Sequence, residues 1–150
     1  MPKEKSAGAV IFRKQEDNVY YLLLHYRSKH WDFPKGHIEE NETDQDTVKR
    51  EVEEETGIKD IKIIPGFKNL IKYFFKHSYG LPKEKAKKIP WTFKTVVFYL
   101  AETETKEVKI SEEHIGFKWL CYKDAYNQLT HKNAKNILDK ADEFLKQGFT

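Results

Sequence analysis

The amino-acid sequence predicts an α/β fold in which helices sandwich a mixed β-sheet. Three observations support this prediction. Several apolar segments have the length and the β-branched or aromatic content typical of strands, one segment carries the cap and stop signals of a helix, and apolar residues near the C-terminus recur at helical spacing. Strands and helices do not alternate regularly, which favours a mixed sheet over a parallel one.

The first strands are predicted in the N-terminal quarter of the chain. Residues 6–12 are apolar and rich in small and β-branched side chains, and residues 15–18 (QEDN) are typical of a turn. Residues 19–26 (VYYLLLHY) are almost continuously apolar, which predicts a central strand. Residues 31–36 (WDFPKG) contain Pro and Gly, and we expect a loop or a short strand there.

A helix is predicted over residues 44–56. Thr43 can cap its N-terminus, with Asp46 three residues later as the capping-box partner. Two valines four residues apart would face inward, and Gly57 fits a left-handed C-cap. The helix therefore has both a predicted start and a predicted stop.

The rest of the chain supplies more strands, a loop and two helices. Residues 78–90 are polar and basic and contain two prolines, which predicts a mobile loop. Strands are predicted over residues 58–64, 67–75, 91–101 and 117–120, and helices over residues 124–129 and 134–144.

The composition is that of a globular protein, with 39% hydrophobic and 14% aromatic residues in 150 positions. We expect residues 1–150 to form one domain. No apolar run approaches the ~18 residues that span a membrane, and the N-terminus lacks the apolar segment of a secretory signal. Cys121, the single cysteine, fits a reducing compartment. We expect a cytoplasmic protein without membrane contacts, and nothing in the sequence indicates a protein partner.

Acidic charge is concentrated in residues 36–58 (GHIEENETDQDTVKREVEEETGI). This stretch has nine acidic and two basic residues, in a chain whose net charge is +3. A basic body around one acidic patch suits a polyanionic ligand that meets the patch through a metal ion. A solvated acidic helix on a lysine-rich protein would account for the charge equally well.

Three carboxylates of this stretch share one helical face. Glu51, Glu54 and Glu55 have i, i+3, i+4 spacing. Such crowding is relieved by a hard divalent cation, and Mg²⁺ commonly joins one or two carboxylates to substrate phosphates. Arg50 stands four residues before Glu54 and can pair with it, and the backbone at Gly36 can approach a metal or phosphate closely. A calcium loop of the EF-hand type is excluded because its pattern is absent.

The same stretch resembles the Nudix box, G-x5-E-x7-R-E-U-x-E-E-x-G-U, where U is aliphatic. Its fixed positions are filled by Gly36, Glu42, Arg50, Glu51, Val52, Glu54, Glu55, Gly57 and Ile58. The resemblance implies a Nudix hydrolase, an α/β/α sandwich that binds Mg²⁺ or Mn²⁺ and cleaves a nucleoside diphosphate linked to another group. By this resemblance the three helix glutamates hold the metal, often with the carbonyl at Gly36, while Arg50 and Glu42 orient them. The catalytic candidates within the box are Glu51, Glu54 and Arg50.

Outside the box, most of the chain resembles the asymmetrical diadenosine tetraphosphate (Ap4A) hydrolases. The matching segments are SAGAVIF at 6–12, LLL at 22–24, HW and PKGH within 30–37, GFK at 66–68, KTVVFYLAE at 94–102, SEEH at 111–114 and FKWL at 117–120. The resemblance implies metal-dependent hydrolysis of Ap4A to ATP and AMP, with water attacking a phosphorus of the polyphosphate chain.

The resemblance also implies substrate contacts, for which the candidates are His30, Lys35, Tyr73, Lys94 and His131. His30 and the two lysines would contact the polyphosphate, and Tyr73 would stack on an adenine. His131 occupies the place of a second aromatic in animal-type relatives. Glu113 would face the helix as a further metal ligand or general base. Solvent-facing lysines, a core tyrosine and a turn capped by Glu113 and its neighbour His114 are the alternative interpretations.

The basic loop is longer than the corresponding hairpin of that family. It adds Tyr79, Lys83, Lys85, Lys87, Lys88 and Trp91, which suit a lid over phosphates, a contact for RNA, or an ordinary lysine-rich surface. Two alternative functions follow: a Nudix enzyme acting on an RNA 5′ end, and a non-catalytic nucleotide-binding module. An eroded box would mark the module, whereas this box is complete.

Overall fold

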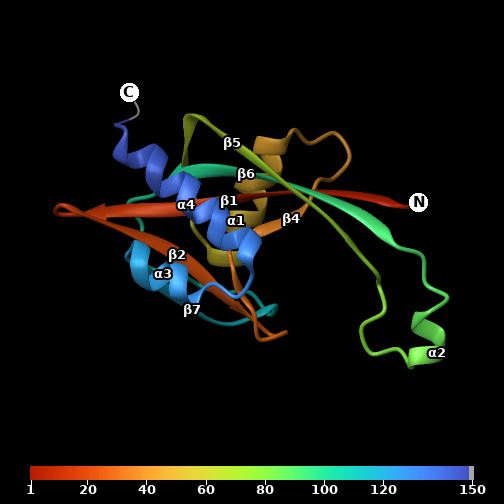
Figure 1. The fold of residues 1–150 in the computed structure, drawn as a ribbon. Coiled ribbons are helices and arrows are strands. Elements are labelled where there is room, and N and C mark those ends of the chain that lie inside the picture. The colour runs from red at the N-terminus through yellow and green to blue at the C-terminus, as the bar shows by residue number, and fades with distance from the viewer. Residues whose placement is uncertain (149–150) are drawn as a thin grey trace.

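A mixed β-sheet with helices on both faces forms the body of the protein (Figure 1). The structure is a computed structural model that describes residues 1–148. The strands are β1 (Lys3–Gln15), β2 (Asn18–Tyr26), β3 (Trp31–Asp32), β4 (Lys35–His37), β5 (Lys62–Phe75), β6 (Thr92–Glu102) and β7 (His114–Leu120). The helices are α1 (Asp44–Thr56), α2 (Lys83–Ala86), α3 (Tyr122–Gln128) and α4 (Lys132–Lys146).

The strand order confirms the predicted mixed sheet. The main path runs β3-β2-β1-β6-β5, with β4 paired to β1 and β7 paired to β2. β1 and β6 run parallel, and the other pairs are antiparallel. β2 lies between β1 on one side and β3 and β7 on the other, as its apolar sequence predicts.

Two hydrophobic cores lie on opposite faces of the sheet. Because successive side chains of a strand point to opposite faces, β1 sends Val10 and Phe12 into one core and Ala9 and Ile11 into the other. α3 and α4 close the first core, while α1 closes the second through its two valines. The helices on both faces make the α/β sandwich that the sequence predicts.

Helix α1 begins and ends where its cap residues predict. The Thr43 hydroxyl accepts a 3.1 Å hydrogen bond from the Asp46 N–H, and the Asp46 carboxylate accepts one of 3.1 Å from the Thr43 N–H. Gly57 is left-handed, with φ of 74°, and its N–H donates to the Glu53 carbonyl. This capping box and C-cap fix which residues face the sheet.

The prediction of separate strands over 58–64 and 67–75 is wrong. A single strand, β5, runs through both segments, and residues 58–61 lie outside it. The pairing register with β6 shifts between Ile63 and Lys68, and Gly66 has φ of 94°. A glycine can adopt this conformation, so the irregularity bends the strand without ending it.

Several other boundaries differ from the prediction. β7 begins at His114 rather than at 117 because its pairing with β2 extends to Tyr26. α3 and α4 include polar first turns that apolar spacing does not mark. Residues 31–36 contain β3 and part of β4, and the short helix α2 interrupts the predicted loop. In residues 1–148 no helix is long and apolar enough to cross a membrane.

One segment projects from the body. Residues 76–91, which we call the β5–β6 arm, connect the ends of β5 and β6 and contain α2 at their tip (Figure 1). At the base of the arm, His77 Nε2 lies 2.5 Å from Glu4 Oε2 near the start of β1. The arm is therefore attached to the sheet at its base, and its tip extends away from it.

Candidate active site

Helix α1 and the segment before β7 form one acidic depression. Its volume is about 330 Å³, and its lining consists of Glu51, Glu54, Glu55, Ser111, Glu112 and Glu113. The helix residues meet there because i, i+3, i+4 spacing puts them on one face. Glu113 comes from the other side, as the resemblance implies. The structure thus brings together all four glutamates predicted as metal ligands.

Arg50 links the carboxylates of the box to one another. Its Nε donates to Glu42 Oε2 at 2.7 Å, and Nη1 donates to Glu51 Oε1 at 2.8 Å and to Glu54 Oε2 at 3.3 Å. Nη2 donates to the carbonyl of His37 at 3.0 Å. Hydrogen bonding to Arg50 lowers the pKa of Glu42 to about 2. Arg50 thus has the orienting position expected of it, with Glu42 as its anchor.

Gly36 lies directly against Glu51. A Cβ built on Gly36 would be 2.0 Å from the carboxyl carbon of Glu51, so no other residue fits without displacing that side chain. Burial raises the pKa of Glu51 to about 7, the neighbouring Glu55 adds to the rise, and Arg50 opposes it. A carboxylate in this position gains from a cation that neutralises its charge.

Glu55 is the buried member of the set, with 2% of its surface exposed. Its Oε1 accepts a 3.2 Å hydrogen bond from the Tyr26 hydroxyl and lies 3.1 Å from His114 Nε2. Its Oε2 accepts a 3.1 Å hydrogen bond from the Lys35 backbone N–H. Burial, with the Glu55 charge next in importance, raises the pKa of Tyr26 well above its usual value. Tyr26 therefore stays a hydrogen-bond donor, and Glu55 is held from three sides.

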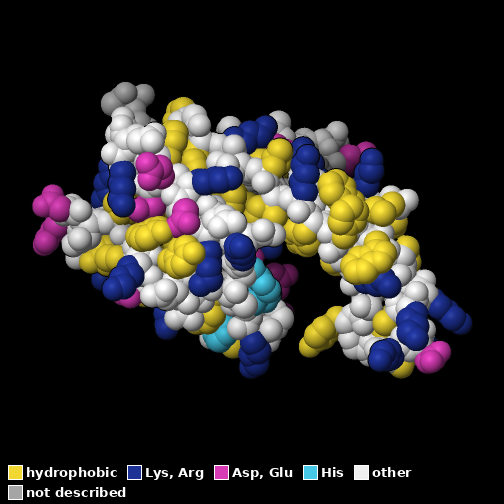
Figure 2. All heavy atoms as spheres, in the orientation of Figure 1, with side chains coloured by type: hydrophobic (Ala, Val, Ile, Leu, Met, Phe, Trp, Pro, Cys, Tyr) yellow, Lys and Arg dark blue, Asp and Glu magenta, His cyan; other side chains and the backbone are white. Residues whose placement is uncertain are grey.

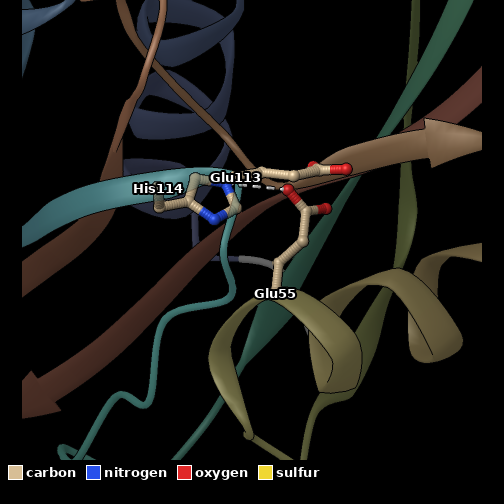
Figure 3. A group of neighbouring side chains, drawn as sticks. All are labelled: Glu55, Glu113 and His114. Carbon is tan, nitrogen blue, oxygen red and sulfur yellow. Dashed lines mark ion pairs between the residues drawn. The ribbon is translucent and has the colours of Figure 1, made fainter.

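Figure 3 shows Glu55 reaching from α1 toward Glu113 and His114. One potential ligand atom from each of these residues lies within 4.8 Å of the others. His114 Nδ1 is 2.9 Å from Ser111 Oγ, so both ring nitrogens face protein atoms and the ring orients Glu55. The carboxylates remain as donors, and hard divalent cations such as Mg²⁺ prefer oxygen ligands. This donor set, with a glycine pressed against Glu51, fits a divalent metal.

A second cavity, of about 500 Å³, adjoins the acidic depression. It is lined by His30, Asp32, Lys35, Ile71, Tyr73, Val96, Phe98, His131, Lys132, Asn133 and Ala134. Four of the five predicted substrate contacts are thus together in one lining. Lys35 Nζ pairs with Asp32 at 3.0 Å. Burial would lower the pKa of Lys35, but the Asp32 carboxylate outweighs it, so that the pKa is raised and Lys35 keeps its charge.

Lys94 is the predicted substrate contact that this lining does not include. It lies on β6, is 7% exposed, and its Nζ is 3.4 Å from Glu4 Oε1. Burial lowers its pKa, while Glu4 opposes the change. Its position favours the pairing of β6 with the start of β1, and its contact with polyphosphate stays a prediction.

The sequence gave no role to three residues that orient the predicted ones. Tyr26 and His114 hold Glu55, and Asp32 holds Lys35. His114 had a usable signal, because it follows Glu113 directly, but was considered only as a turn cap. Tyr26 and Asp32 are an ordinary strand tyrosine and a loop acid in the sequence, and only the folded chain shows their partners.

Comparisons with known proteins agree with this geometry. The model of the NUDIX domain family matches residues 2–141. The asymmetrical bis(5′-nucleosyl)-tetraphosphatase of Mus musculus is 33% identical over 153 residues, covering 94% of this chain and 95% of that one. An RNA pyrophosphohydrolase of Nitratiruptor is 28% identical over 79% of this chain and 76% of its own. A crystal structure of a C. elegans Ap4A hydrolase binary complex superposes with a TM-score of 0.78 at 28% identity, covering 96% and 98% of the chains. The chain therefore belongs to the Nudix hydrolase family.

Proposed function

We propose that the protein hydrolyses Ap4A to ATP and AMP with Mg²⁺, for which Mn²⁺ can substitute. The observation that supports this most is the position of Lys35. Its backbone N–H binds Glu55 of the acidic depression, and its ammonium group lines the adjoining cavity. A polyphosphate that follows Lys35 would have its phosphates beside the carboxylates and its nucleoside between Tyr73 and His131.

Each group has a role in this proposal. Glu51, Glu54, Glu55 and Glu113, with the carbonyl at Gly36, would hold the metal, which supplies charge neutralisation and an acidified water. His30 and Lys35 would contact the phosphate chain, and Tyr73 would stack on an adenine. One of the depression's exposed carboxylates, Glu54 or Glu113, accepts the proton as water adds to phosphorus and the bridging P–O bond breaks.

A cytoplasmic location belongs to the same proposal. It is supported by the single cysteine, which is typical of a reducing compartment. The choice of Mg²⁺ is supported by a donor set made of carboxylate oxygens.

The similarity to an RNA pyrophosphohydrolase favours a second candidate, removal of phosphates from an RNA 5′ end. The two candidates differ in which product forms. Purified protein with Mg²⁺ should convert Ap4A to equimolar ATP and AMP, measured by anion-exchange chromatography. If Ap4A stays intact while a 5′-triphosphorylated RNA loses pyrophosphate, the first candidate is wrong and the second holds.

A further inference from the structure

The β5–β6 arm carries positive charge that no part of the active site uses. It contains five lysines and one acidic residue, Glu84. The four lysines at and around α2, which are Lys83, Lys85, Lys87 and Lys88, are all exposed. None of the four forms an ion pair with any residue among 1–148. This concentration of uncompensated charge is complementary to a polyanion.

Exposed aromatic rings accompany these lysines. Tyr79 is 99% exposed and Trp91 is 53% exposed, whereas aromatic rings of this size are usually at least partly covered. The Lys76 ammonium lies 4.9 Å from the centroid of the Trp91 ring. Lysines among exposed rings are typical of surfaces that bind single-stranded nucleic acid, where bases stack on the rings and phosphates meet the cations.

The arm continues directly from the wall of the substrate cavity. Tyr73 lines the cavity, and Phe75 and His77 follow on the same side of the strand, with successive ring centroids 6.1 Å and 4.6 Å apart. Figure 2 shows a hollow between the arm and the body, with histidine side chains on the body side of the hollow. Because His77 is paired with Glu4, this row of rings has a fixed base.

The length of the arm exceeds what a dinucleotide needs. From Tyr73 to Tyr79 an extended chain spans at most about 20 Å, at roughly 3.3 Å per residue. Stacked bases of one strand are spaced about 3.4 Å apart, so this distance matches several nucleotides. A ligand that uses the whole surface is therefore a chain of nucleotides.

We propose that the β5–β6 arm binds single-stranded RNA, with its lysines on the phosphates and Tyr79 and Trp91 stacked on bases. Binding of this kind goes beyond the proposed hydrolysis and does not require it. The assignment to RNA rests on the proposed function in one respect, because that function puts ribonucleotides in the cavity from which the arm extends.

Fluorescence anisotropy with a 3′-labelled, 5′-hydroxyl, single-stranded RNA of 12 nucleotides, in EDTA, tests this binding apart from any hydrolysis. The wild type should bind at low salt. Replacing the four arm lysines by Gln should flatten the plot of log affinity against log salt by up to about 3, at about 0.7 per phosphate contact. Tyr79→Ala with Trp91→Ala should weaken binding about five- to 150-fold for each stacked base lost.

The matched control removes four exposed lysines elsewhere, by changing Lys59, Lys106, Lys123 and Lys140 to Gln. Thermal unfolding checks that every variant is folded. Weaker binding in the arm variants, with the control variant like the wild type, supports the proposal. It is overturned if the wild type binds no RNA, if the control loses as much affinity as the arm variant, or if duplex RNA or anionic vesicles bind as tightly. Ap4A hydrolysis is assayed separately, so loss of one activity does not imply loss of the other.

Discussion

Gly36 and Glu51 are packed so closely that a Cβ on Gly36 would lie 2.0 Å from the Glu51 carboxyl carbon. Gly36→Ala should therefore displace Glu51 and reduce kcat/KM for Ap4A at least about 100-fold, since small displacements at a catalytic site have effects of this size. The matched control is Gly116→Ala, because the nearest atom to a Cβ there is 3.9 Å away. Steady-state kinetics of both variants checks this, and equal activity in the two would refute the packing argument.

Glu42 should stabilise the fold in a pH-dependent way through Arg50. Its pKa is lowered to about 2 in the folded protein, so this contribution is fully present above the unfolded pKa of about 4.3. It is lost as the pH falls toward 2. Urea unfolding between pH 3 and pH 7 should show the wild type more stable than Glu42→Gln at pH 7, with the difference shrinking below about pH 5.

The control for this prediction is Glu40→Gln. Glu40 is exposed and has no hydrogen bond or ion pair with the residues that the structure describes. Its substitution should leave the pH dependence of the unfolding free energy unchanged. A constant difference between wild type and Glu42→Gln down to pH 3 would rule out the assigned role of the pair.

The glutamate set of α1 could be predicted because helical spacing alone determines which side chains share a face. Glu51, Glu54 and Glu55 needed only a correctly placed helix, and Thr43 and Gly57 define its ends. The same holds for the sheet, whose buried strands have unbroken apolar sequences. Local sequence was sufficient wherever the determining contacts lie within one element.

Partners from different elements could not be predicted in this way. Tyr26 of β2 and His114 of β7 meet Glu55 of α1 only because β2 pairs with β7, which depends on the complete sheet. Likewise, the bulge that joins two predicted strands into β5 depends on pairing with β6. Lys94 was assigned to substrate by resemblance, whereas its partner, Glu4, lies ninety residues earlier in the chain.

Tyr73 should contribute to binding rather than to the chemical step. It lines the cavity and is half-buried, so Tyr73→Leu removes the stacking surface while keeping apolar volume. We expect KM for Ap4A to rise about five- to 150-fold, the range for loss of one base–aromatic stack, with kcat little changed. Tyr73→Phe should restore KM. A fall in kcat alone, or no rescue by Phe, would argue against stacking.

Lys94 offers a test of structure against substrate contact. Because it is buried and paired with Glu4, Lys94→Met should keep the packing of its stem and lose the ion pair. If its role is structural, thermal stability should fall and KM for Ap4A should stay the same. A several-fold rise in KM at unchanged stability would instead place Lys94 on the polyphosphate. Unfolding midpoints and KM measured on the same preparation separate the two.

The central claim is that the carboxylates of α1 hold the metal on which hydrolysis depends. Glu54 and Glu53 are adjacent and both exposed, but only Glu54 lines the acidic depression. The most direct test is the rate of Ap4A hydrolysis by Glu54→Gln and Glu53→Gln across a Mg²⁺ titration. We predict no activity of the wild type in EDTA, wild-type behaviour of Glu53→Gln, and a loss of at least about 100-fold in Glu54→Gln with an unchanged unfolding midpoint. Near-full activity of Glu54→Gln, or wild-type hydrolysis without metal, would contradict the claim.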